Sequence, residues 1–426
     1  MTEDRLRVFL DQIGGWNGFE VAQVSTEETA APDALGMPAP RIIVELRPKE
    51  GCPKICSRCG EIVVEIHDVT DRRVRDLPIG ECDTWLIVPR ARLQCPRCGP
   101  TVEAVPWLDR YQRMTKRLAD KIAQLAQVLP IKHVAMWFGV SWDTVKQIDR
   151  RSIAKRLGPV EEQWDGLRVL AIDEFAIQRG YRYATVVIDP TRKRVVWICR
   201  GRDEGALAGF FTALGPARCK GIEAVAVDMW APYCAAVRKH CPAAKLVYDQ
   251  FHVAAKYGVD VINRVRIDET NRVGRAAGKS PVRSLRRVVK GTRWLLLRNR
   301  ENITSRADRI RLRDLLRANK PLFICYVLKD DLKQLWRFRY PGAARRFWRE
   351  WRRRAVASGL TPLLKFVRTM DRYIDGIINH CRYPLNTAML EGINNKIKVI
   401  KRMAYGFRDD AYFFLKIRAH FPGIAG

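Results

Sequence analysis

Three carboxylates stand where acidic side chains can act together. Asp173 ends the largely apolar run 167–172, and Asp228 ends a second apolar run, 222–227. Glu391 lies in a later segment whose pattern is typical of a helix. Acids at the ends of neighbouring buried strands, joined by a third acid from a helix, can hold two divalent metal ions for phosphoryl transfer. Each acid alone is more often a helix cap or a surface ion pair, so the prediction rests on their combination.

The segments around the first two acids predict one α/β core. Short apolar runs and helical stretches follow one another in the order βββαβαβ, which is that of a ribonuclease-H-like fold. The expected strands are 167–172, 183–188, 194–199, 222–227 and 245–248, and the expected helices are 203–214 and 231–240. In such a core Asp173, on the first strand, and Asp228, after the fourth strand, lie side by side.

The predicted helix that carries Glu391 has further polar residues on the same face. Asn395, Lys398 and Arg402 follow Glu391 by 4, 7 and 11 residues, which is the spacing of one helical face. A carboxylate followed by an amide and two cations suits an acid beside a phosphate backbone. Lys398 and Arg402 are therefore predicted to contact nucleic acid.

The chain carries a large excess of positive charge. It has 426 residues, with 77 Lys and Arg against 46 Asp and Glu, and a formal net charge of +31. Because such a charge opposes compaction unless a polyanion neutralises it, nucleic acid is the expected partner and an anionic membrane surface the weaker alternative. The 47% hydrophobic content allows packed cores, and the length suggests about two to four domains.

The composition also predicts where the protein works. No apolar run approaches the roughly 18 residues of a membrane span. The N-terminus lacks the apolar segment of a signal peptide. We therefore expect a cytoplasmic, nucleoid-associated protein without membrane attachment.

Four of the twelve cysteines have the spacing of a zinc site. Cys56 and Cys59 form one Cys-x-x-Cys pair, Cys95 and Cys98 form a second, and a glycine follows each pair. Each pair makes a knuckle whose two thiolates can take two corners of a zinc tetrahedron. The pattern predicts a structural Zn²⁺, with a set of buried free thiols as the alternative.

The residues around the cysteine pairs also predict a zinc ribbon. The runs 62–66 and 85–88 between the pairs, and the run 41–46 before them, are typical of strands. Cys52 and His67 are rival zinc ligands. We expect the eight remaining cysteines to be mostly core thiols, because free cysteine is often buried; they are Cys52, Cys82, Cys199, Cys219, Cys234, Cys241, Cys325 and Cys381.

Residues 115–157 predict helices that include a helix-turn-helix. A first apolar stripe is formed by Leu118, Ile122, Leu125 and Leu129. Farther along, Gly139 can make a tight turn and Ser141 can cap the next helix. That helix offers four side chains to a DNA groove, namely Trp142, Lys146, Gln147 and Arg150. The alternative is an ordinary helical hairpin.

The stretch from Phe251 to about His380 predicts a basic helical region. It contains an arginine cluster interleaved with aromatic residues: Arg345, Arg346, Arg349, Arg352, Arg353 and Arg354 with Phe347, Trp348 and Trp351. Such a mixture suits backbone contacts and base stacking. The alternative is a solvated basic face whose aromatic residues pack inside.

With these motifs in their observed order, the chain resembles the DDE transposases of bacterial insertion sequences, and specifically their ISL-three family. The cysteine pairs, the helix-turn-helix and the segments 171–174, 227–230, 248–253, 390–398 and 404–408 carry the resemblance, which runs from about residue 41. It implies a ribonuclease-H-like catalytic domain and recognition of terminal inverted repeats. It also implies that Asp173, Asp228 and Glu391 bind two Mg²⁺ or Mn²⁺, that water cleaves the element ends, and that the freed 3′-hydroxyl attacks target DNA.

Two further expectations come from the resemblance. Asp249 and His252 match an Asp-x-x-His signature that related transposases carry after the second acid, so His252 is expected in the catalytic site. The family logic also implies a helical insertion between the second and third acids. A tryptophan in such an insertion can stack on a displaced base, and Trp294, beside Arg293 and near Arg287 and Lys290, is the best candidate.

The expected protein is therefore an α+β multidomain transposase. Its expected parts are an N-terminal segment (1–50), a zinc ribbon (51–110), a helix-turn-helix domain (111–160), the first part of a ribonuclease-H-like core (161–260), a basic helical insertion (261–380) and the C-terminal helix of the core with the third acid (381–426). The expected partner is double-stranded DNA, both element ends and target, with homo-oligomers on DNA because two ends must join one target. The rival functions are a transposase-derived DNA-binding regulator without catalysis and a nuclease without strand transfer.

Overall fold

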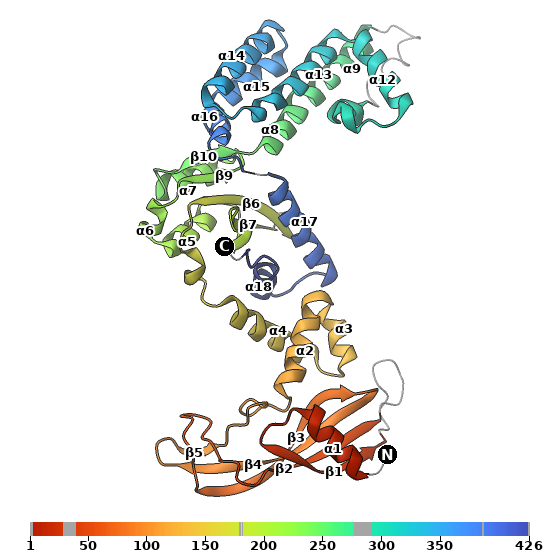
Figure 1. The fold of residues 1–426 in the computed structure, drawn as a ribbon. Helices are drawn as coiled ribbons and strands as arrows, with labels where there is room; N and C mark the ends of the chain where they lie inside the picture. Colours follow the sequence, from red (N-terminus) through yellow and green to blue (C-terminus); the bar gives the residue numbers. More distant parts are fainter. Residues whose placement is uncertain are drawn as a thin grey trace. The chain divides into compact units, whose positions relative to one another are not determined.

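The computed structural model describes residues 3–28, 40–178, 180, 182–276, 292–385 and 387–424. Figure 1 shows the course of the chain, which divides into two compact units. The first unit comprises Met1–Arg156 with Lys401–Leu415, and the second comprises Leu157–Ile400 with Lys416–Gly426.

A five-stranded sheet begins the first unit. Its strands are β1 (Phe19–Glu27), β2 (Arg41–Pro48), β3 (Ile66–Ile79), β4 (Cys82–Cys95) and β5 (Gly99–Val102), in the order β1-β2-β4-β3 with β5 paired to β4. Helix α1 (Glu3–Gly14) contributes Leu10 to the core beneath the sheet. Residues 25–27 belong to β1, and residues 29–39 lie outside the described residues.

The ribbon strands differ from their predicted positions. The expected strand 62–66 is wrong, because β3 begins only at Ile66 and Ile62 forms an isolated bridge with Ile55. The expected strand 85–88 lies inside the 14-residue strand β4. Much of β3 is exposed and charged, so its hydrophobicity does not reveal it.

Three helices confirm the predicted helix-turn-helix region. They are α2 (Lys116–Val128), α3 (Ile131–Trp137) and α4 (Trp142–Leu157). Gly139 makes the turn with a φ of +55°, and the Ser141 hydroxyl accepts a hydrogen bond from the Thr144 backbone N–H at 3.1 Å. In the predicted apolar stripe Leu118 and Ile122 are buried, whereas Leu129, the C-cap of α2, is 39% exposed.

A mixed five-stranded sheet organises the second unit. Its strands are β6 (Val169–Gln178), β7 (Arg182–Asp189), β8 (Arg194–Arg200), β9 (Ala224–Val227) and β10 (Lys245–Tyr248), in the order β10-β9-β6-β7-β8. Strands β6, β7 and β8 are antiparallel neighbours, whereas β9 and β10 run parallel to β6. The predicted strand order is confirmed, but β6 continues six residues beyond 172, so Asp173 lies within the strand.

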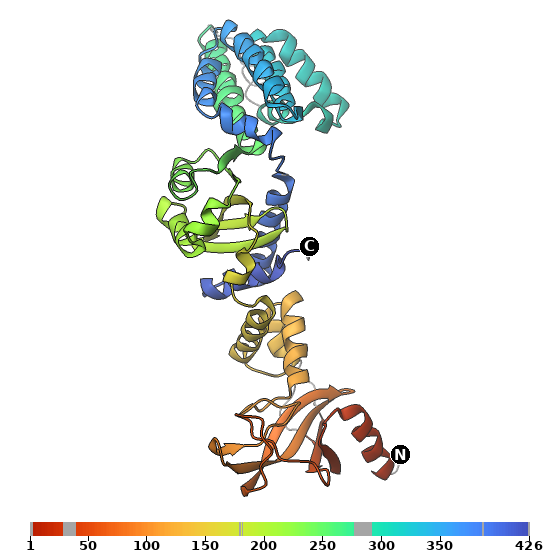
Figure 2. The same ribbon diagram turned by 60° about the vertical axis from the view of Figure 1, so that its left-hand side comes forward.

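Helices cover both faces of this sheet (Figures 1 and 2). Helices α5 (Glu204–Leu214), α6 (Pro216–Lys220) and α7 (Ala231–His240) lie on one side, where Phe210 and Val237 join Leu170 in the core. Helix α17 (Thr387–Met403) lies on the other side. The short helix η1 (Glu161–Trp164) precedes the sheet, and α18 (Asp410–His420) follows α17.

The described chain between β10 and α17 is helical. Its elements are α8 (Gln250–Tyr257), η2 (Gly258–Asn263), α9 (Arg264–Ala276), α11 (Arg293–Leu297), η3 (Arg300–Asn302), α12 (Arg306–Ala318), α13 (Lys320–Lys333), η4 (Gln334–Arg337), α14 (Pro341–Ala357), α15 (Thr361–Asp371), α16 (Ile374–Ile378) and η5 (Asn379–Cys381). Their buried residues are continuous with the core of the sheet. Among the described residues, no helix combines the length and the apolar character that crossing a bilayer requires.

Helix α14 corrects the prediction of base-stacking aromatic residues. Trp348 and Trp351 are buried, and Trp351 packs against Tyr257 and Phe366. The six arginines of the cluster are exposed on the opposite face of the helix. The 3.6-residue period separates the two sets, so this helix has a basic surface over an aromatic core.

Candidate active site

Two of the predicted acids lie at neighbouring strands of the second sheet. Strands β6 and β9 pair in parallel register, with Ala171 opposite Ala226. Asp173 and Asp228 each lie two residues beyond that pair and are half-buried. Parallel strands bring their carboxyl ends to one edge of a sheet, where ligands commonly bind in α/β proteins.

Helix α17 reaches the first of these acids through an asparagine. The Asn394 side-chain amide donates a hydrogen bond of 2.6 Å to Oδ2 of Asp173, and the Glu174 backbone N–H donates one of 2.8 Å to Oδ1. Glu391 lies three residues before Asn394, about 4.5 Å earlier along the helix axis. It is exposed, and within the described residues it forms no hydrogen bond or ion pair.

His252 lies at the same edge. Asp249 follows β10, caps helix α8 by accepting a hydrogen bond from Phe251, and places a carboxylate oxygen 3.3 Å from Nδ1 of His252. The contact with Asp249 raises the pKa of His252 above its usual value; burial opposes the rise, while Asp173 and Asp228 add to it. The structure thus gathers Asp173, Asp228 and His252, while Glu391 lies three residues before Asn394 on α17.

The surroundings of the two half-buried acids raise their pKa values. Burial raises the pKa of Asp173 above its usual value, opposed by the Glu174 N–H, by His252 and by the Asn394 amide. Burial also raises the pKa of Asp228, and the charge of Asp173 adds to that rise while His252 opposes it. Neighbouring carboxylates that resist ionisation are suited to binding a cation.

The sequence did not predict a role for Arg202, whose guanidinium lies beside this edge and contacts two aromatic rings. The Arg202 guanidinium lies 4.5 Å from the ring centre of Tyr183 and 5.3 Å from that of Trp230, and 3.6 Å from a Glu174 oxygen. The Trp230 indole donates a hydrogen bond to the Arg202 carbonyl, and its backbone N–H donates one to Asp228. The only sequence signal was a tryptophan two residues after an acid, because Arg202 comes from the far end of β8.

In the first unit, four cysteines form a metal site. Their Sγ atoms, from Cys56, Cys59, Cys95 and Cys98, all lie within 4.8 Å of one another, and no other such group occurs among the described residues. The Cys59 and Cys95 sulfurs are 3.6 Å apart, close to the ~3.8 Å that ~2.3 Å zinc–sulfur bonds give in a tetrahedron. The backbone N–H groups of Cys59 and Arg58 lower the pKa of Cys56 to about 6 against the effect of burial. This donor set fits a structural Zn²⁺.

The rival zinc ligands are not part of this cluster. Cys52 is exposed, so its assignment to the core is also wrong. His67 is exposed and lies 3.2 Å from Asp68. The other cysteines are buried or half-buried, as predicted.

The second helix of the helix-turn-helix presents three of its four predicted residues to solvent. Trp142, Gln147 and Arg150 are exposed. Lys146 instead forms a 2.9 Å ion pair with Asp409 and lies over the rings of Trp142 and Tyr412. Lys146 therefore holds the chain after α17 against α4.

The other predicted nucleic-acid contacts lie on exposed positions. Trp294 is 67% exposed, with the Arg293 guanidinium 5.4 Å from its ring centre, so it is not a core tryptophan. Arg287 and Lys290 lie outside the described residues. Lys398 and Arg402 are exposed on α17, and Lys398 donates a long hydrogen bond of 3.5 Å to Asn395.

Comparison with known protein families agrees with this architecture. Residues 170–417 match the DDE transposase domain of the ISL3 family. Residues 103–153 match the helix-turn-helix domain of transposase family ISL3, and residues 53–98 match the zinc-finger of transposase IS204/IS1001/IS1096/IS1165. Along the chain the zinc-finger match comes first, the helix-turn-helix match second and the DDE match last.

Two curated relatives span almost the whole chain. The chain is 45% identical over 420 residues to the transposase for insertion sequence element IS1001 of Bordetella parapertussis, which covers 98% of this chain and 99% of that protein. It is 28% identical over 445 residues to the transposase for insertion sequence element IS1557 of Mycobacterium tuberculosis, covering 99% and 97%. The chain belongs to the ISL3 family of transposases. It is a DNA-binding enzyme of transposition with a zinc ribbon, a helix-turn-helix and a DDE catalytic domain, which implies a divalent catalytic metal.

Proposed function

We propose that Asp173, Asp228 and Glu391 together hold two Mg²⁺ or Mn²⁺ ions for cleavage and joining of DNA. The observation that carries this proposal is the convergence of β6, β9 and α17, in which Asn394 of α17 bonds to Asp173 beside Asp228. Ions held by these three carboxylates would supply charge stabilisation for the attacking oxygen and for the leaving 3′-oxygen.

The residues at this edge fit such ions. Carboxylate oxygens are the ligands that Mg²⁺ prefers. Burial raises the pKa of both Asp173 and Asp228; the charge of Asp249 adds to the rise at Asp173, and the charge of Asp173 adds to the rise at Asp228. Glu391 need not contact Asp173 or Asp228 directly, because the ligands of a two-metal site are divided between two ions. Its exposed position one turn from Asn394 leaves it free to reach the second ion.

The chain's own residues complete the proposed site. Asn394 orients the Asp173 carboxylate, and the Trp230 N–H orients that of Asp228. His252, held by Asp249, supplies a positive charge or a proton beside the acids. Arg202, clamped between two rings, supplies a fixed cation for a phosphate next to the scissile bond.

The sheet supports a ribonuclease-H-like catalytic core with a helical insertion. The core would combine three antiparallel strands, β6 to β8, with two parallel strands, β9 and β10, and receive α17 after the helical region. The domain boundaries proposed from the sequence, with the zinc ribbon at 51–110 and the helix-turn-helix at 111–160, belong to the same proposal.

The DNA partners follow from the family. The two named relatives are transposases for particular insertion sequence elements, and we infer that this chain binds the terminal inverted repeats of its own element and a target duplex. The exposed Trp142, Gln147 and Arg150 would read the repeat, with Lys398 and Arg402 on phosphates near the catalytic edge. Arg293 and Trp294 would hold a displaced base. We expect homo-oligomers on paired ends in the cytoplasm, at the nucleoid.

One experiment separates this function from its rivals. The wild-type protein is incubated with Mg²⁺, a labelled duplex carrying the element's terminal repeat and a supercoiled target plasmid. We expect both cleaved ends and ends joined to the plasmid. Specific binding without cleavage would support a regulator, and cleavage without joined product would support a nuclease.

A further inference from the structure

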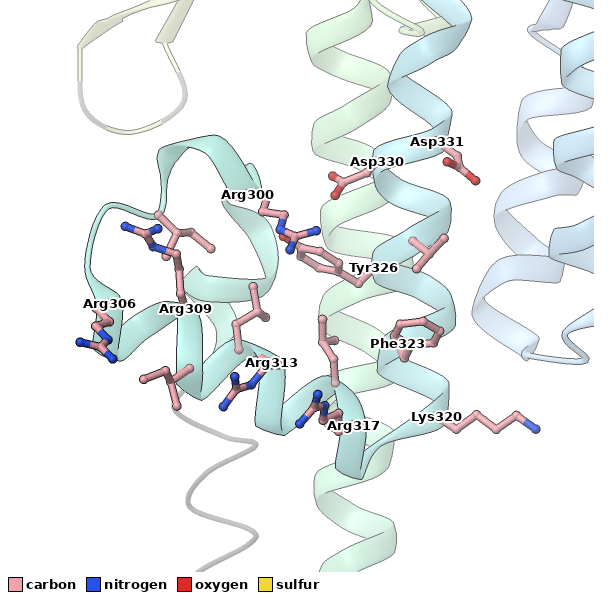
Figure 3. A pocket seen from close by; sticks show the side chains of 15 residues that line it. Arg300, Arg306, Arg309, Arg313, Arg317, Lys320, Phe323, Tyr326, Asp330 and Asp331 are labelled. Carbon is pink, nitrogen blue, oxygen red and sulfur yellow. The ribbon is translucent and has the colours of Figure 1, made fainter.

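A hollow of about 930 Å³ opens between helices α12 and α13, away from the catalytic edge. Figure 3 shows its lining, with arginines spaced along α12 and Phe323 and Tyr326 on α13. On α12 the lining arginines are Arg306, Arg309, Arg313 and Arg317. Steps of three and four residues place them on one helical face. From Arg309 to Arg317 the helix rises about 12 Å, which equals the axial rise of roughly three to four nucleotides in one DNA strand.

The charges of this face are largely uncompensated. Arg306, Arg317 and Lys320 are exposed and form no ion pair or hydrogen bond with any side chain that the structure describes. Among the residues that the structure describes, the Arg313 side chain pairs only with its exposed neighbour Asp314, at 3.2 Å. An exposed pair of this kind is weak, so the face remains strongly positive.

The two acids in the lining do not offset these arginines. Asp330 lies 3.3 Å from Lys333, and Asp331 lies 2.7 Å from Arg354. Neither cation lines the hollow. Figure 3 shows both acids on α13 beyond Tyr326, away from Lys320 and Arg317.

Apolar side chains lie exposed beside the positive face. Phe323 is 50% exposed, Ile310 is 41% exposed and Val327 is 38% exposed. A duplex turns its phosphates outward and keeps the flat faces of its bases stacked inside, so it offers little to an exposed phenyl ring. An unpaired strand offers both phosphates and base faces, and proteins bind such strands with basic grooves that carry aromatic residues.

We propose that this hollow binds an unpaired DNA strand, with phosphates on the α12 arginines and a base against Phe323. The proposal rests on the transposase function, since cleavage at an element end exposes single strands. An acidic peptide shares the charge but offers no flat base to Phe323.

The test measures binding of fluorescent oligonucleotides to the full-length protein. The probes are an unpaired strand, the same strand with abasic sites and the matching duplex without a terminal repeat. The variants are Arg317→Glu and Phe323→Ala, with Phe323→Trp as the rescue. Arg311→Glu is the matched control, because Arg311 is exposed on the same helix but does not line the hollow.

We expect Arg317→Glu to weaken strand binding about tenfold more than Arg311→Glu does. We expect Phe323→Ala to weaken binding of the intact strand about tenfold, a loss that Phe323→Trp restores and that the abasic strand does not show. Duplex binding should change equally in the Arg317→Glu and Arg311→Glu proteins. The proposal would be overturned if Arg317→Glu and Arg311→Glu weakened binding of the unpaired strand equally, or if Phe323→Ala bound it as the wild-type protein does. Displacement of the strand by a polyglutamate peptide of equal charge would also overturn it.

A parallel assay keeps this result separate from the proposed active site. Mg²⁺-dependent cleavage of a terminal-repeat duplex is followed with the same wild-type preparation. If the wild-type protein binds the strand through Phe323 but cleaves no end, the active-site proposal fails and the strand site stands. If it cleaves ends while the variants match their control in strand binding, the strand site alone fails.

Discussion

Asn394 donates a 2.6 Å hydrogen bond to Asp173, although 221 residues separate them in the chain. This bond joins the helix that carries Glu391 to the strand that carries the first acid. It also counteracts the effect of burial, which raises the pKa of Asp173. The proposed third acid, Glu391, therefore lies on the same helix as a residue that bonds to Asp173, three positions before it.

The first prediction concerns this bond. Asn394→Ala removes a donor that favours the ionised carboxylate, so the pKa of Asp173 should rise further. Asp173 would then ionise only at higher pH, and the acidic limb of cleavage activity should move upward in pH. Initial nicking rates across roughly pH 5–9 measure this limb. Asn395→Ala, on the exposed face of the same helix, is the control, and equal profiles for both variants would rule out the role of Asn394.

The second prediction concerns Arg202. Its guanidinium is fixed between Tyr183 and Trp230, so Arg202→Ala should slow cleavage about 10²-fold, a typical loss for one preorganised charge. Arg202→Lys should recover only part of the rate, because lysine lacks the planar group that stacks on the rings. Single-turnover cleavage rates and end-binding affinity are measured together. A wild-type cleavage rate in the Arg202→Ala protein would mean that Arg202 pairs with Glu174 but has no role in cleavage.

The third prediction concerns zinc. The purified protein should contain one zinc per chain, and Cys56→Ser or Cys95→Ser should lose it. Because thiolate ligation is coupled to local folding, these variants should also unfold the ribbon around Val63 and Leu93. Elemental analysis with amide exchange measures both effects. Cys52→Ser, at an exposed thiol outside the cluster, should keep its zinc; metal-free wild-type protein that is folded would contradict the site.

The fourth prediction concerns Trp294. Because its side chain is 67% exposed, Trp294→Ala should change the free energy of unfolding by no more than about 0.5 kcal/mol. It should nevertheless weaken binding of nicked ends by roughly 1–3 kcal/mol while leaving intact duplex binding unchanged. Thermal denaturation and binding to both duplexes are compared, with Trp294→Phe as the conservative variant. A loss of stability without selectivity for nicked ends would contradict base stacking.

The sequence predicted the succession of strands and helices along the second unit, because its strands are short apolar runs between clear turns. Asp228 was placed correctly after β9, since that strand is buried along its length. The sequence did not predict β3, because its exposed charged residues give no hydrophobic signal. This strand is held by its pairing with β4. The sequence also missed Arg202 and Asn394, because their partners come from other elements and leave no local pattern. For α14 the sequence left two interpretations open, and the structure confirms the alternative in which the tryptophans pack inside under a basic face.

Glu391 is proposed to complete the catalytic set with Asp173 and Asp228. The most direct measurement is Mg²⁺-dependent cleavage of a terminal-repeat duplex by the Glu391→Gln protein, with end binding measured in parallel. Glu301→Gln, in the helical region, serves as the matched control. We predict that Glu391→Gln, like Asp173→Asn and Asp228→Asn, yields no cleaved product while binding the ends as the wild-type protein does, because a lost metal ligand affects the transition state more than the many phosphate contacts. Cleavage by Glu391→Gln at the rate of the Glu301→Gln control would contradict the claim.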